Sequence, residues 1–153
     1  MNEKQPQRML RSIGAVLAGL LAVIILSIGT DAALHATGVF PPWGRPMPDG
    51  LFMLATFYRT VYGIVGGYIA ARLAPYRPIA HALALGVVGF VVSLAGVVAT
   101  WNAGPEFGPK WYPLALVAIA MPSAWLGGRL LGTKLRARAD GDKEKKPGRN
   151  GGT

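Results

Sequence analysis

Four long apolar runs dominate this sequence and leave few folds open to it. They cover residues 12–37, 51–73, 79–100 and 112–131. Each run is about as long as the 20 helical residues that a bilayer core requires. Because backbone groups in hydrocarbon must find their hydrogen-bond partners within the protein, such runs fold as helices. The sequence therefore predicts an all-α fold, an integral membrane bundle of four transmembrane helices within residues 12–133.

Composition and charge support this membrane class. The chain is 52% hydrophobic, only 15% charged, and has no cysteine, which excludes disulfides, thiolate catalysis and cysteine-bound metals. Its first apolar run is longer than the roughly 7–15 residues of a signal-peptide core and is followed by no A-x-A cleavage site, so we expect a retained helix. The net charge of +9 does not indicate nucleic acid, because half of the basic residues follow Leu126 and flank the last run.

The basic residues also predict the orientation of the helices. The two outer loops carry one basic residue each, Arg45 and Lys110. The other flanks carry Lys4, Arg8 and Arg11, then Arg72 and Arg77, and finally Arg129, Lys134, Arg136, Arg138, Lys143, Lys145, Lys146 and Arg149. Basic flanks stay in the cytoplasm, so both termini are predicted there (N-in/C-in), with residues 1–11 as a cytoplasmic tail.

The C-terminal end, residues 134–153, is basic and polar and lacks apolar anchors. This composition predicts a disordered cytoplasmic tail. We favour attraction to anionic lipid headgroups as its role over recruitment of a protein partner.

Small residues recur at the spacing that lets membrane helices pack closely. Gly63 and Gly67 form a GxxxG pattern in the second run, and Gly128 and Gly132 do so in the fourth. Equivalent small pairs are Ala15–Gly19 and Ala82–Gly86. We favour contacts within the bundle, with a homo-oligomer as the alternative. Pro122 interrupts the fourth run and is expected to kink it.

A few polar residues lie inside these apolar runs. Asp31 and Arg59 fall at matching depth on consecutive antiparallel helices, on the order of 10 Å beneath the outer interface at about 1.5 Å per residue. Neither charge is tolerated alone in hydrocarbon, so an ion pair is predicted. His35 shares a helix face with Asp31, while Tyr58 and Tyr62 lie near Arg59. The predicted cluster is Asp31, His35, Arg59, Tyr58 and Tyr62.

Two interpretations of this cluster remain open. Ionisable groups within a membrane often bind a ligand or move protons, which makes the five residues a candidate binding site. Alternatively, the ion pair is a structural clasp that fixes the register of the first helical hairpin, and we favour this interpretation slightly. No catalytic, cofactor or metal motif is present, and the two histidines lie on opposite sides of the membrane. We therefore expect no enzyme activity, no cofactor and no metal site.

The stretches "FYRTVYGIVGGYIAARLAPYRPIAHALALG" and "GPKWYPLALVAIAMPSAWLGG" resemble a group of small uncharacterised bacterial four-helix membrane proteins. The resemblance spans about residues 11–131 and implies four helices in the bacterial inner membrane. It implies no activity, and no functional residue carries over from it.

These observations predict a small multi-pass membrane protein of structural or accessory type, a subunit of a larger membrane assembly. The alternative is a transporter or binder of a small molecule or ion that uses the Asp31–Arg59 cluster near the outer face. An intramembrane enzyme is the weakest reading. The expected partners are the lipid bilayer, anionic headgroups, and another membrane protein or a second copy of this chain.

Overall fold

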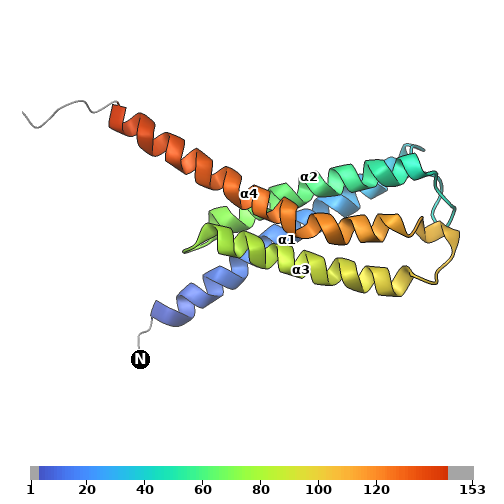
Figure 1. Ribbon diagram of the computed structural model, residues 1–153, viewed down its shortest axis with the longest axis horizontal. Coiled ribbons are helices and arrows are strands. Elements are labelled where there is room, and N and C mark those ends of the chain that lie inside the picture. Colours follow the sequence, from blue (N-terminus) through green and yellow to red (C-terminus); the bar gives the residue numbers. More distant parts are fainter. Residues whose placement is uncertain (1–3, 145–153) are drawn as a thin grey trace, which may run out of the picture.

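The computed structural model describes residues 4–144, and these form an all-α bundle (Figure 1). The elements in chain order are α1 (Lys4–Ala36), α2 (Asp49–Leu73), α3 (Pro78–Thr100), the short 3-10 helix η1 (Pro105–Phe107) and α4 (Trp111–Glu144). Described residues form no strand. The predicted fold class is therefore confirmed for the helices themselves.

The connections between the helices follow from local sequence. α1 ends where Gly38 adopts a positive φ of 75°, and the Phe40 amide donates to the Leu34 carbonyl at 2.9 Å, which turns the chain back. α2 stops just before Pro75, and α3 begins at Pro78, where proline's missing amide hydrogen costs nothing. Short connections of this kind place consecutive helices antiparallel and adjacent.

α2 and α3 lie at the centre of the helix contacts. α2 packs against α1, α3 and α4, and α3 packs against α1, α2 and α4. The two loops that precede α2 and α4 lie together at one end of the bundle (Figure 1). The beginning of α1, the α2–α3 connection and the end of α4 lie at the opposite end.

Close helix contacts are made at small residues. The backbone of α2 at Gly67 lies against the backbone of α4 at Ala124, and a Cβ at Gly67 would be 2.8 Å from the Ala124 Cα. Gly127 meets α2 in the same way, with the Tyr68 amide nitrogen 2.6 Å from where its Cβ would be. Gly63 faces Ser123, so the GxxxG pattern of α2 makes its contact within the bundle, against α4.

Only one glycine of the second GxxxG pattern, that of Gly128 and Gly132, packs against another helix. Gly128 packs against Ala82 of α3, but nothing lies within 4 Å of a Cβ placed at Gly132. Gly127 takes the place of Gly132 as the second close-packing glycine of α4, because adjacent residues face different neighbouring helices. Gly19 of α1 packs against the Gly66 carbonyl, and Ala15 and Ala82 are buried.

The start of α1 and the end of α4 extend further than predicted. α1 begins at Lys4, within the expected tail of residues 1–11. α4 continues to Glu144, so the prediction of disorder from residue 134 is wrong for residues 134–144. Lys, Arg and Ala favour helix and extend it without any tertiary contact. Residues 145–153 of the predicted tail lie outside the described residues.

α4 contains Pro122 and changes direction along its length (Figure 1).

Three segments of the described chain are long and apolar enough to cross a membrane. They are Pro6–Ala36, Pro78–Thr100 and Pro105–Gly141. α2 is not among the three, because Arg59 and the tyrosines near it lower the hydropathy of its apolar run. α2, like α3, packs against the other three helices, and the side chains of Tyr58 and Arg59 form hydrogen bonds with α1.

Candidate functional site

An ion pair between α1 and α2 forms the centre of the candidate site. Asp31 lies in the last two turns of α1, and Arg59 lies in the first half of α2. The Arg59 Nη2 donates to the Asp31 Oδ2 at 2.6 Å, and the two side chains are 31% and 20% exposed. The structure thus confirms the predicted pairing. The two charges of the pair balance each other.

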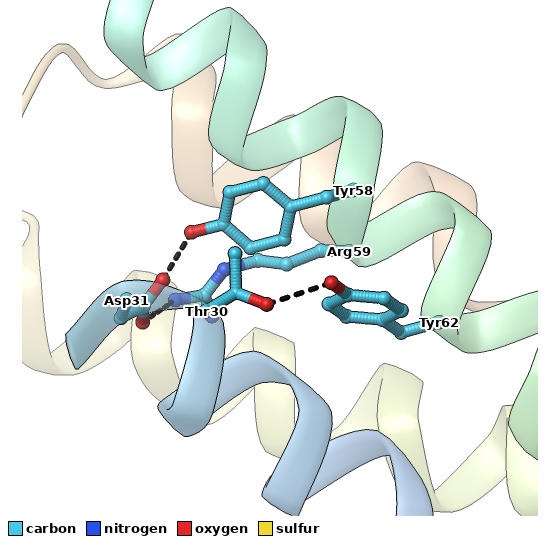
Figure 2. Close-up of polar contacts among 5 residues, drawn as sticks. All are labelled: Thr30, Asp31, Tyr58, Arg59 and Tyr62. Carbon is cyan, nitrogen blue, oxygen red and sulfur yellow. Dashed lines mark hydrogen bonds and ion pairs between the residues drawn. The ribbon is translucent and has the colours of Figure 1, made fainter. Parts of the chain in front are cut away.

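Two tyrosines of α2 complete the contacts with α1 (Figure 2). The Tyr58 hydroxyl donates to the Asp31 Oδ1, so both carboxylate oxygens are engaged by α2. The Tyr62 hydroxyl shares a 2.7 Å hydrogen bond with the Thr30 hydroxyl. The rings of Tyr58 and Tyr62 pack at 5.7 Å between centroids. We call Thr30, Asp31, Tyr58, Arg59 and Tyr62 the polar clasp.

His35 does not join the polar clasp, although the sequence places it on the same helix face as Asp31. Its Nδ1–H donates to the Pro41 carbonyl at 2.7 Å. The ring stacks on Trp43 at 3.7 Å and meets the edge of Phe40 at 5.4 Å. His35 lies one turn nearer the helix end than Asp31, where the loop after α1 folds back over it. His35 therefore fixes the loop between α1 and α2 against the end of α1.

A small apolar cluster covers the clasp on one side. Phe40, Ala55 and Tyr58 are buried together, and Tyr112 of α4 packs against them. The Tyr112 ring also contacts Phe52 of α2, with 4.9 Å between centroids. Sequence reasoning missed Thr30, Phe40 and Tyr112. Thr30 adjoins Asp31 in the sequence and was open to inference, whereas the contact of Tyr112 depends on how α4 packs.

On its other side the clasp borders a cavity of about 420 Å³ that all four helices line. Its polar lining is limited to Ser27, Asp31, Arg59, Ser93 and Ser123, and the remaining lining residues are apolar or glycine. A volume of this size lies within the range of small-molecule sites. Asp31 and Arg59 therefore have one side packed in protein and one side at the cavity.

The guanidinium of Arg59 has more donors than the clasp uses. It carries five N–H groups, and only Nη2 donates to Asp31 among the described residues. Its Nε is buried and has no hydrogen-bond partner within the described part of the chain. Asp31, by contrast, already accepts two hydrogen bonds. The donors of Arg59 that remain for a ligand are therefore those of the Nη groups, since its Nε is buried.

The chemistry available to these residues is binding and positioning. Tyr58 and Arg59 hold the Asp31 carboxylate from both sides, which leaves no side chain in the clasp arranged as a nucleophile beside a free base. Within residues 4–144, no group of three His, Cys, Asp or Glu side chains could hold a metal ion.

Comparison of this chain with protein-family models, with curated proteins and with solved structures found no match. The resemblance of the sequence to small bacterial four-helix membrane proteins therefore stays a prediction.

Proposed function

We propose that this chain is a multi-pass protein of the bacterial inner membrane, with four spanning helices and both termini in the cytoplasm. The fold supports this topology because it gathers the basic flanks at one end. Arg8, Arg11, Arg72 and Arg77 belong to the end where α1 begins and α2 turns into α3, together with the basic part of α4. Arg45 and Lys110 belong to the opposite end, where the Lys110 ammonium lies 4.8 Å from the Trp101 ring centroid.

The topology has a direct test. Reporter fusions after residue 45, after residue 75 and at the C-terminus should read outside, inside and inside, because positive flanks remain cytoplasmic. Alkaline phosphatase, active only outside, and green fluorescent protein, fluorescent only inside, give opposite readings at each position. A fusion after residue 75 that reads outside would contradict four spans and show that α2 does not cross the membrane.

We further propose that the protein acts as a non-catalytic structural or accessory subunit of a membrane assembly. The closed polar clasp is the observation that carries this proposal. Both oxygens of Asp31 are bound by side chains of α2, so the paired charges fix the register of the α1–α2 hairpin. Exposed Lys134, Arg136 and Arg138 continue the helix of α4 beyond the bundle and suit anionic headgroups at the cytoplasmic face.

The accessory proposal predicts a complex of fixed composition. The protein is expressed at its native level and extracted in mild detergent. Native mass spectrometry should then show a complex heavier than the 16.1 kDa of the chain itself. The complex should contain one partner, or a second copy of the chain, in constant ratio. A control protein with the same number of spans and a similar basic tail measures chance association. Repeated recovery of the monomer alone would contradict the proposal.

A second candidate function is binding or transport of a small molecule at the Asp31–Arg59 cluster. The cavity favours it, because it places two ionisable side chains at the border of an apolar space of ligand size. A clasp and a binding site are compatible here, since Arg59 retains donors that Asp31 does not use.

A further inference from the structure

The two charged residues that line the cavity beside the clasp lie toward one end of it. Asp31 and Arg59 lie at its outer end, and Leu20, Val23 and Leu85 line its inner end. On α1 alone the lining runs from Leu20 to Asp31, which at about 1.5 Å per residue is roughly 16 Å of helix. A ligand that fits this space is elongated, with one polar end at Arg59 and an apolar body directed toward the middle of the bundle.

The cavity opens between α1 and α3. Among its lining residues, Ile24 and Ile28 of α1 and Val92 of α3 are exposed, with Ile28 and Val92 each 63% accessible. Further along the bundle the two helices are in contact, because Leu85 of α3 lies against Gly19 of α1. In the proposed topology this opening faces the acyl chains of the outer leaflet. Its occupant is therefore drawn from the bilayer.

The polar end selects a neutral hydrogen-bond acceptor. Arg59 keeps N–H groups that the clasp does not use, but its charge is already balanced by Asp31. The ion pair lies on the order of 10 Å from the helix ends, whereas the headgroup layer of one leaflet is about 5–8 Å thick. The acceptors at that depth are the ester carbonyl oxygens of a phospholipid, since the phosphates lie nearer the helix ends.

We propose that this cavity binds one acyl chain of an outer-leaflet phospholipid, with its ester carbonyl oxygen accepting a hydrogen bond from Arg59. The inference rests on the membrane location proposed above and specifies the ligand class of the second candidate function. Leu20, Val23 and Leu85 contact the chain, and the small residues Gly86 and Gly89 of α3 make the space for it.

The decisive experiment uses the full-length, unmodified protein. After delipidation in mild detergent, it is titrated with diester phosphatidylethanolamine and, separately, with the diether analogue of identical headgroup and chain length. Native mass spectrometry counts the bound lipid. Because a hydrogen bond to a charged donor is lost with the carbonyl, the diether lipid should bind roughly tenfold more weakly. Equal affinity for both lipids would overturn the assignment of the carbonyl to Arg59.

A pair of glycine variants on α3 tests the cavity itself. Gly89→Leu should fill it and abolish lipid retention, and a Cβ at this position meets only the Ala120 Cβ, at 3.7 Å. Gly96→Leu is the matched control, since it lies outside the cavity lining and its Cβ meets nothing within 4 Å. Undiminished retention by Gly89→Leu would overturn the proposal.

The two proposals fail in distinguishable ways. If membrane fractionation finds the chain in the soluble fraction, the membrane location fails and this inference fails with it. If the chain is in the membrane but does not discriminate between the two lipids, only this inference fails. The titration of the unmodified protein decides the outcome even if Gly89→Leu does not fold.

Discussion

Replacing Arg59 by Leu alone should lower the free energy of unfolding by about 3 kcal/mol, because Asp31 is then left as an unpaired charge beside an apolar cavity. Asp31→Asn should have a similar effect, because it leaves the guanidinium without its counter-charge. The value lies at the lower end for buried pairs because both side chains are partly exposed. Tryptophan fluorescence during reversible unfolding in mixed micelles with sodium dodecyl sulfate measures the change.

The double replacement, Asp31→Leu with Arg59→Leu, should recover most of that loss, since no charge then remains to be desolvated. Arg45→Leu is the matched control. It removes an exposed cation of the outer loop and should change the unfolding free energy by less than about 0.5 kcal/mol. Single variants as stable as the unmodified chain would contradict the clasp. A double variant that is as stable as the unmodified chain but has lost the cellular phenotype would favour the binding function.

Gly67→Ala should destabilise the bundle by about 3 kcal/mol, although it adds one methyl group. The new Cβ would lie 2.8 Å from the Cα and 2.9 Å from the carbonyl carbon of Ala124. Those are backbone atoms of α4, so no side-chain rotation relieves the overlap and the two helices must separate. The same unfolding assay applies, with proteolysis of the α2–α3 connection as a second measure of loosened packing.

Gly132→Ala serves as the control for this prediction. It belongs to the other GxxxG pattern, but a Cβ there meets nothing within 4 Å. We expect no loss of stability and a gain of up to about 1 kcal/mol, because Ala favours helix over Gly. Equal losses in the two variants would show that Gly132 packs against another molecule, which the accessory proposal or a homo-oligomer would explain.

The two charged residues of the clasp were predictable because their positions are fixed by helix geometry. Asp31 and Arg59 are 28 residues apart, on consecutive helices joined by a short loop, and the rise per residue puts them at the same depth. The cost of an isolated charge in hydrocarbon then requires the pair. The length of the apolar runs likewise predicted four helices, with the cores of their ranges correct.

What the sequence did not predict depends on the rotation and packing of helices. Gly127 and Gly132 are equally plausible packing residues by spacing, and only the orientation of α4 against α2 and α3 distinguishes them. His35 shares a face with Asp31, but the loop after α1 provides a nearer acceptor at Pro41. The cavity was beyond prediction, because its lining comes from all four helices and each contributes only a few residues.

The polar clasp has a consequence for the biogenesis of the protein. Its hydrogen bonds are confined to α1 and α2, so the charge on α1 is neutralised as soon as the second helix has been synthesised. In the proposed topology, the first hairpin can therefore leave the translocon as a pre-paired unit. α3 and the apolar part of α4 carry no comparable charge. They can therefore leave the translocon later and pack against the α1–α2 hairpin. In that topology the helices can assemble in the order of their synthesis.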